Sequence, residues 1–218
     1  MIRGKIKRFY ETAAAEPCDP LRDGFGVVLD GRAIRTPAKA RLIVPTRALA
    51  EALAAEWAEQ GAEVDPRAMP LTRLACTAID WVGANRRQVV ADVAAYGGHD
   101  LLCYRAEAPA GLATRQQAVW QPLLDWAARR FDAPLAVTAG IVSVPQPPEA
   151  LAALRRAVEG LSDMELVALN AAVTAAGSLV IGLALAAGRI GPDEAFAAAQ
   201  LDETYQIARW GEDPETSR

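Results

Sequence analysis

The chain has 218 residues, which is enough to bury a sizeable core as one large domain or two small ones. Its formal net charge of -4 argues against a nucleic-acid-binding protein, because such proteins bind phosphates mainly through lysine and arginine. The cysteines at 18, 76 and 103 lack the close pairing of zinc or redox sites. They indicate free thiols in a reducing compartment, and we expect neither a metal nor a cofactor.

The first residues, MIRGKIKRFY, are basic, and their cations alternate with Ile2, Ile6 and Phe9. This pattern is typical of an edge strand with solvated charges, and a patch for nucleic acid or phospholipid is the alternative. No signal peptide precedes the strand-like sequence. We therefore expect a cytoplasmic protein.

The stretch GFGVVLDGRAIRTP predicts a β-hairpin that turns at Asp30-Gly31. Phe25, Val27 and Leu29 alternate as in a half-buried strand, and Asp-Gly supplies the positive φ angles of a two-residue turn. Residues 41–44 offer a third strand and residues 4–10 a possible fourth. Together they predict a small antiparallel sheet with one buried face.

A helix is expected after Pro45-Thr46, ending at Gly61. Leu49, Leu53 and Trp57 follow one another at i+4 spacing, so they share the face that would cover the sheet. Trp57 is then the largest core anchor of this helix, or alternatively a partly exposed aromatic contact.

From about Leu71 onward the sequence predicts a mainly helical lobe. Capping boxes, Thr114 with Gln117 and Ser162 with Glu165, indicate two helix starts. Pro122 is expected to kink or restart the first of these helices, and residues 135–148 indicate a short strand or extended connector.

The 22 residues from Leu166 to Ala187 carry no charge and are formally long enough to cross a bilayer. Alanine, glycine and scattered polar residues dominate them, so a helical core divided at Gly177 is favoured over membrane insertion. A peripheral membrane protein that exposes this segment is a remaining alternative. A last helix is expected to start at Pro192 and to turn Phe196, Ala199 and Leu201 inward.

These elements predict an α+β fold, with a small antiparallel β-rich N-terminal lobe packed against a mainly α-helical C-terminal lobe. We place the first lobe, with its one covering helix, at residues 1–68. The helical lobe occupies residues 69–218.

The block LDETYQIARWGED is dense in acidic and aromatic side chains. On a helix, Asp202, Tyr205 and Arg209 fall near one stripe, with Glu203, Gln206 and Trp210 on the adjacent one. An exposed carboxylate beside an exposed tryptophan is the kind of pair that dominates binding energy at protein interfaces. Alternatively, Trp210 folds back onto the helical lobe and Glu203 pairs with a nearby arginine.

Sites for catalysis are weakly indicated. His99 is the one histidine of the chain and is followed by Asp100, but no nucleophile motif accompanies them. Carboxylates such as Glu203 and Glu212 could do acid-base chemistry if they lay close together. A small hydrolase or transferase that uses His99 or the C-terminal carboxylates is therefore the alternative to a binding protein.

Six blocks occur in order along nearly the whole chain: KRFY, GFGVVLDGRAIRTP, VPTRALAEALAAEW, MPLTRLACTAID, DLLCYRA and LDETYQIARWGED. Together they resemble the ATP synthase assembly chaperones of the ATP-twelve family. The resemblance implies a β-rich N-terminal lobe, a helical C-terminal lobe and no enzymatic activity. It also implies that the protein binds the free α subunit of F-type ATP synthase, shields the surface that faces β from aggregation, and releases α to β.

By the same resemblance, Glu203 is the acidic position expected to bind the partner. Asp202, Arg209 and Trp210 would support it, and Trp57 would contribute from the first lobe. The ending WGEDPE departs from the longer tryptophan-containing ending of the mitochondrial members.

Overall fold

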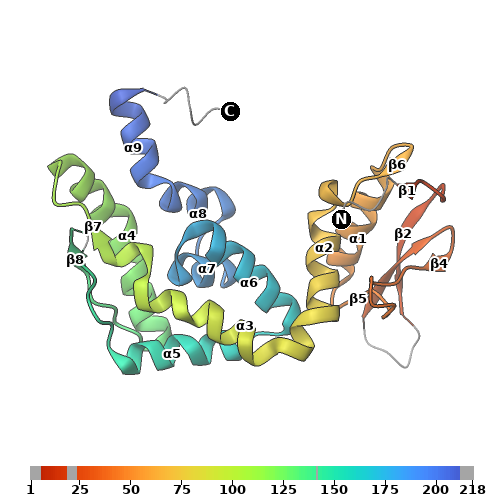
Figure 1. The fold of residues 1–218 in the computed structure, drawn as a ribbon, viewed down its shortest axis with the longest axis horizontal. Helices are drawn as coiled ribbons and strands as arrows, with labels where there is room; N and C mark the ends of the chain where they lie inside the picture. The colour runs from red at the N-terminus through yellow and green to blue at the C-terminus, as the bar shows by residue number, and fades with distance from the viewer. Residues whose placement is uncertain (1–5, 19–23, 141, 212–218) are drawn as a thin grey trace. The chain divides into compact units, whose positions relative to one another are not determined.

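The computed structural model describes residues 6–18, 24–140 and 142–211. By their contacts the residues form two compact units, which we call the N-terminal unit (Met1–Arg86 with Ser162–Val167) and the C-terminal unit (Arg87–Leu161 with Ala168–Arg218). The sequence-based division at residues 68 and 69 differs from this one because residues 69–86 pack within the N-terminal unit. The fold is α+β, as the sequence predicted (Figure 1).

The sheet of the N-terminal unit has β3 (Phe25–Leu29) at its centre. β2 (Ala13–Pro17) pairs antiparallel with one edge of β3, while β4 (Arg32–Ala33) and β5 (Ile43–Val44) pair antiparallel with successive parts of the other. The inward residues Val27 and Leu29 are almost completely buried. Val28 between them is also buried and Phe25 is partly buried, so burial in this strand does not alternate residue by residue as the sequence predicted.

The predicted hairpin is confirmed at β3 and β4. Asp30 and Gly31 both have positive φ, 47° and 74°, as a two-residue turn requires. The side chain of Asp30 also accepts hydrogen bonds from the N–H groups of Glu11 and Thr12. The turn residue thus ties the hairpin to the chain that leads into β2.

The expected strand at residues 4–10 does not join this sheet. Its described part forms β1 (Ile6–Lys7), which pairs with β6 (Glu63–Val64) as a separate two-stranded sheet. The fourth strand of the main sheet is β2, whose sequence AAAEP has neither β-branched residues nor clear alternation. Its pairing with β3 is decided by tertiary contacts, and the sequence pattern alone missed it.

Helix α1 (Arg47–Ala58) covers the sheet, as expected (Figure 1). Thr46 caps it, because its hydroxyl accepts a hydrogen bond from the N–H of Leu49. Leu53 is fully buried in a cluster with Val27, Leu42 and Val44 of the sheet. Helix α2 (Pro70–Thr77) and a π-helical segment (Ala78–Val82) follow in the same unit.

The C-terminal unit is mainly helical. Its elements are α3 (Gly83–Ala95, which begins in the N-terminal unit), α4 (Ala110–Phe131), α5 (Pro148–Glu159), α6 (Asp163–Ala176, which also begins there), α7 (Leu179–Ala186), α8 (Pro192–Ala199) and α9 (Leu201–Trp210). β7 (Tyr104–Arg105) pairs in parallel with β8 (Thr138–Ala139). The expected short strand within residues 135–148 is therefore confirmed.

The uncharged segment forms α6 and α7, and it is divided at Gly177 as predicted, where φ is +64°. Ser178 caps α7, and residues 179–184 are all buried. Gly182 fits so closely against α6 that a Cβ there would lie 2.5 Å from a methyl group of Val173. None of the helices in the described ranges combines the length and apolar character that a bilayer-spanning helix requires.

One of the predicted capping boxes is confirmed. Ser162 and Glu165 exchange hydrogen bonds at the start of α6, whereas Thr114 lies inside α4, whose N-cap is Pro109. Helix α4 also continues without interruption through Pro122, so the predicted restart is wrong. Packing on both sides of the proline keeps the helix intact, because Trp120, Leu123 and Leu124 are all buried.

The last helix begins at Pro192 as predicted, but it ends at Ala199, and α9 starts after Gln200. Leu201 is buried, whereas Phe196 is 69% exposed, so its expected inward position is wrong. Because the chain breaks at Gln200, the 3.6-residue spacing of α8 does not continue into α9. The residues of α9 that face the core therefore differ from those that one continuous helix would turn inward.

Candidate partner-binding site

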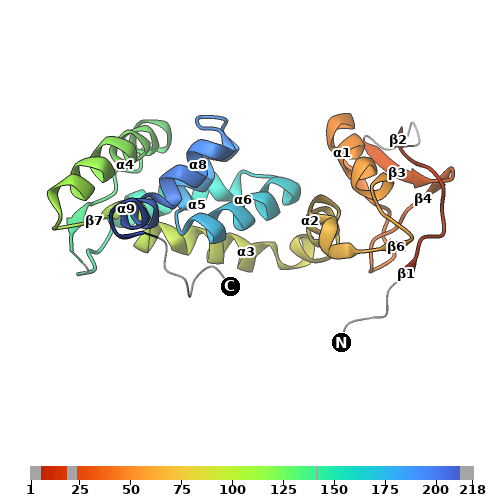
Figure 2. The ribbon, with the colours of Figure 1, turned by 90° about the horizontal axis from the view of Figure 1, so that it is seen from above.

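Helix α9 carries most of the residues predicted to bind a partner, and it lies against α4 and α8 (Figures 1 and 2). Leu201 is buried at its start, and the partly buried Tyr205 packs on the same core cluster. The inner face of α9 is therefore fixed by apolar contacts, which leaves its other faces to solvent.

Asp202 faces inward at the edge of this contact. Its Oδ1 accepts a hydrogen bond from Nε2 of Gln116 on α4 (2.8 Å), and Oε1 of Gln116 accepts one from the N–H of Ala106 (2.7 Å). Gln116 is almost completely buried. Asp202 thus anchors α9 to α4 with one of its oxygens.

Arg105 lies in the same polar network. Its Nη1 donates to the carbonyl of Gln116 (2.9 Å), and its guanidinium lies over the ring of Trp120. Burial lowers the pKa of Arg105, while the carboxylate of Asp202 acts in the opposite direction. Nε of Arg105 has no hydrogen-bond partner among the described residues. The carboxylate of Asp202 therefore favours the charged form of this guanidinium.

Glu203, Ile207 and Trp210 form the outer stripe of α9, since their spacing places them on one side of the helix. All three side chains are exposed, and Trp210 is 68% accessible. Glu203 forms no hydrogen bond or ion pair with any other described residue. The predicted alternatives, in which Trp210 folds back and Glu203 pairs with an arginine, do not occur within the described part of the chain.

Arg209 stays close to the helix surface. Its Nη1 donates to the hydroxyl of Tyr205 (3.3 Å), and its guanidinium lies over the ring of Trp210, 5.6 Å from the centroid. The guanidinium therefore lies against one face of the tryptophan.

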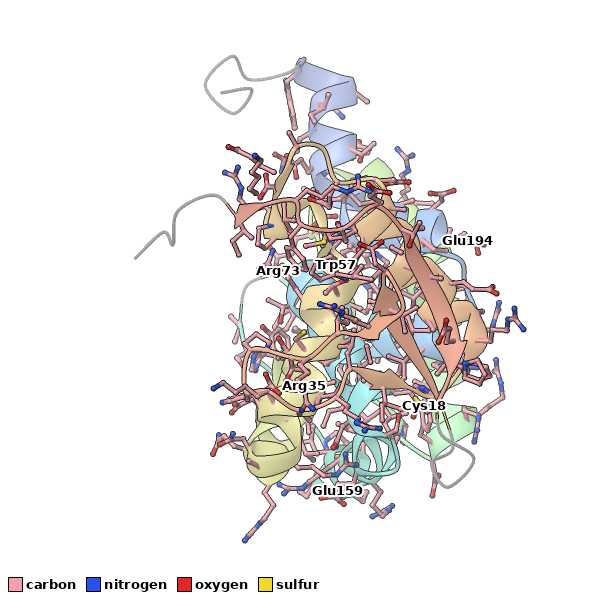
Figure 3. All side chains as sticks on the ribbon, turned by 90° about the vertical axis from the view of Figure 1, so that its right-hand side faces the viewer. Cys18, Arg35, Trp57, Arg73, Glu159 and Glu194 are labelled. Atoms are coloured by element: carbon pink, nitrogen blue, oxygen red, sulfur yellow. The ribbon has the colours of Figure 1, made fainter. Side chains whose placement is uncertain are left out.

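Trp57 belongs to the N-terminal unit, where it is labelled in Figure 3. It is partly buried and contacts both hydrophobic clusters of that unit. Its carbonyl accepts a hydrogen bond from the hydroxyl of Tyr10 (2.7 Å), and the two rings meet edge to face. The indole Nε1 is buried and has no hydrogen-bond partner in the described part of the chain. Trp57 has features of both predictions, a core anchor and a partly accessible aromatic side chain.

A pocket of about 580 Å³ lies beside Trp57. Phe9, 69% exposed, forms part of its wall, and Arg32 and Arg35 contribute cations. Asp30 also lines it, but hydrogen bonds from Thr12 occupy this carboxylate and lower its pKa. A pocket role for Phe9 was not expected from the sequence, because the alternation of the basic N-terminus indicates an edge strand.

His99 and Asp100, the neighbouring pair considered for catalysis, make separate contacts in the described structure. Asp100 is fully buried and accepts hydrogen bonds from Leu102, Ser178 and Val180, while His99 packs its ring on Tyr96. Glu212 lies outside the described residues. Within those residues, no group of three or more histidine, cysteine or acidic side chains is arranged to hold a metal ion.

The chain is similar to known proteins over nearly its full length. Residues 7–128 match the ATP12 chaperone protein family. The crystal structure of Atp12 from Paracoccus denitrificans is 44% identical and superposes with a TM-score of 0.89 over 97% of this chain and 90% of that one. A mutant of the same protein gives a TM-score of 0.90 at 43% identity, over 97% of this chain and 89% of that one.

Protein atp12, mitochondrial, of Schizosaccharomyces pombe is 24% identical over 219 aligned residues, which cover 94% of this chain and 74% of that protein. A match to the family across more than half of the chain, together with solved structures of the same fold at more than 40% identity, identifies its relatives. The chain belongs to the ATP12 family, whose members are chaperones of ATP synthase assembly.

Proposed function

We propose that this protein binds the free α subunit of F-type ATP synthase, shields its β-facing surface and releases it to β during assembly. An unassembled subunit exposes apolar surface intended for its neighbour and would aggregate if left bare. The chaperone need only cover that surface reversibly. In this role it needs no catalytic centre, and the cytoplasmic location expected from the sequence stays a prediction.

The outer stripe of α9 is the observation that carries this proposal. Glu203 has no intramolecular partner among the described residues, and exposed apolar side chains, Ile207 and Trp210, accompany it. A carboxylate framed by apolar surface is well suited to bind a basic or polar group of a partner. Asp202 and Arg209 support the stripe by fixing the helix and the indole ring.

We expect Glu203→Lys to fold normally and to bind the α subunit poorly. The side chain is exposed, so its replacement leaves the core intact, whereas losing one partner of a desolvated charged hydrogen bond costs about 2–5 kcal/mol. Affinity is measured by titrating purified α subunit onto the immobilised chaperone. Suppression of α aggregation, followed by light scattering, gives a second readout.

Glu149→Lys is the matched control, since it makes the same substitution at an exposed carboxylate at the start of α5, outside α9. The control is expected to bind α nearly as the unmodified chain does. Unchanged affinity of Glu203→Lys would refute the assignment of the site. Selective capture of β instead of α would refute the proposed partner.

A further inference from the structure

A groove of about 410 Å³ lies between α4, α8 and α9 in the C-terminal unit. Most of the side chains along it are apolar, and they come from all three helices and from the turn before α8: Ala118, Val119, Pro122, Leu123, Ile190, Ala197, Ala198 and Leu201. Glu194, at one rim, is labelled in Figure 3. The volume lies within the range of sites that hold one or a few apolar side chains.

Buried contacts beneath the groove hold the three helices together. Nε1 of the buried Trp120 on α4 donates to the carbonyl of Ala198 at the end of α8 (2.8 Å), and Leu123 and Leu201 are buried beside it. The groove is therefore a fixed feature of three packed helices, and a ligand would find it largely formed.

Several apolar side chains of the groove are exposed to solvent. Val119, Pro122 and Ala197 are all exposed there. Pro122 has no N–H, so the carbonyl of Ala118 lacks the donor that an α-helix normally supplies four residues later. This carbonyl belongs to a residue of the groove, where a partner could offer it a hydrogen bond.

The charges along the groove are unbalanced. Arg115 and Arg189 line it and are exposed, and neither guanidinium group forms a hydrogen bond or ion pair with another described residue. Glu194 is the one carboxylate among the described lining residues, and it is occupied by the N–H of Gly191, where it completes the cap of α8. The lining thus combines apolar surface with two guanidinium groups and one carboxylate, so positive charge is in excess.

The groove is also continuous with the outer stripe of α9. Leu201 and Thr204 line it, and Ile207 follows Thr204 after three residues, on the side that leads to Glu203. A single partner seated on the outer stripe would therefore reach the groove across the neighbouring face of α9, where Thr204 lies.

We propose that this groove receives an amphipathic segment of the same client, in which an aliphatic or aromatic side chain is flanked by carboxylates. The inference rests on the proposed function and adds the chemistry of the client. The apolar side chain fills the groove, while the carboxylates pair with Arg115 and Arg189. Glu203, on the neighbouring face of α9, contacts a basic or polar group of the client, so the two places select opposite charges and fix the direction in which the client lies.

The first test is the double variant Arg115→Glu/Arg189→Glu, with the purified α subunit as the probe. Like charges placed opposite the client carboxylates are expected to weaken binding by about tenfold or more. The control, Arg87→Glu/Arg129→Glu, makes the same change in net charge at exposed arginines outside the groove and is expected to stay within about twofold. Thermal unfolding of both variants checks that each is folded.

The second test places a photoreactive amino acid at Val119, in the groove, or at Val137, which is equally exposed outside it. Cross-linking from Val119 is expected to capture α at an apolar residue with aspartate or glutamate within a few positions. A cross-link to a second copy of the chaperone, to β, or to a segment without carboxylates would overturn the inference.

The outcomes separate the two proposals. If the unmodified chain does not capture α, the proposed function and the inference fall together. If the unmodified chain and Arg115→Glu/Arg189→Glu capture α equally well, the proposed function stands and the groove is not part of the interface.

Discussion

Asp100 is a fully buried carboxylate that fixes two neighbouring helix starts. Its oxygens accept hydrogen bonds from the N–H of Leu102 (3.0 Å), the hydroxyl of Ser178 (2.7 Å) and the N–H of Val180 (3.0 Å). Burial raises its pKa, while these donors act in the opposite direction. Because the donors come from residues far apart in sequence, the carboxylate links the turn after α3 to the start of α7.

Replacing Asp100 by alanine is expected to lower the free energy of unfolding by roughly 3 kcal/mol, since each buried donor left without an acceptor costs about 1–3 kcal/mol. Urea denaturation followed by circular dichroism measures this change. Asp125→Ala, at an exposed position of α4, is the control and should stay within about 0.5 kcal/mol. If the two variants were equally stable, the free energy of burying the Asp100 carboxylate would be as unfavourable as its hydrogen bonds are favourable.

Helix α9 depends on a small set of contacts for its position. Leu201 and Tyr205 supply apolar packing, and Gln116 of α4 supplies the one described hydrogen bond to Asp202. Few buried contacts and an exposed outer face are the features of an element that opens locally before the whole protein unfolds. The orientation of the proposed binding stripe therefore depends on Gln116.

Gln116→Leu keeps the volume of the side chain and removes its hydrogen bonds. We expect the amides of α9 to exchange faster with deuterium, by about tenfold for a loss of about 1.4 kcal/mol, with α6 and α7 unchanged. Hydrogen-exchange mass spectrometry resolves these segments. Gln117→Leu, exposed on the next position of α4, should leave the exchange of α9 as it is. Faster exchange throughout the C-terminal unit would contradict a local role.

Elements with local signals could be predicted from the sequence. The turn at Asp30-Gly31, the cap at Thr46 and the box at Ser162 each depend on side chains within three residues, and all are present. The strand β2 and the pairing of β1 with β6 depend on partners distant in sequence. The break at Gln200 has no glycine or proline to mark it, so the sequence predicted one helix there.

The candidate site could be predicted in part for the same reason. The order of residues on α9 follows from helical spacing, so the grouping of Glu203 with Trp210 was accessible from sequence. Asp202 and Glu203 are neighbours in sequence, but Asp202 contacts α4 and Glu203 is exposed to solvent. This difference follows from how α9 packs on α4, which the sequence alone does not give. The groove that Arg115 and Arg189 line is built from helices that are distant in sequence. No local sequence motif marks it, so it could not be predicted.

At the scale of the whole molecule, stability depends on a tryptophan that two clusters share. Trp57 packs on the cluster of Val27 and Leu53 and on that of Tyr10 and Val64. A residue that joins clusters supports both, so its loss would weaken the entire N-terminal unit and not one element.

Trp57→Arg is expected to reduce the yield of soluble protein strongly, because it removes a large ring and places a charge beside the core; truncating such a ring alone typically costs about 3–5 kcal/mol. The yield is measured as the soluble fraction after expression. Trp210→Arg makes the same substitution at an exposed position and should express normally. A soluble, stable Trp57→Arg protein that fails to bind α would instead assign Trp57 to the interface.

The N-terminal unit takes its last contributors from a distant part of the chain. Met164 packs on its core, and Asp163 forms an ion pair with Arg86. During translation, the residues made first must therefore wait for those near position 167 before their unit is complete, whereas a domain that is contiguous in sequence can fold as it leaves the ribosome. A ribosome that stalls earlier releases a chaperone with an unfinished core, which would itself need protection from aggregation.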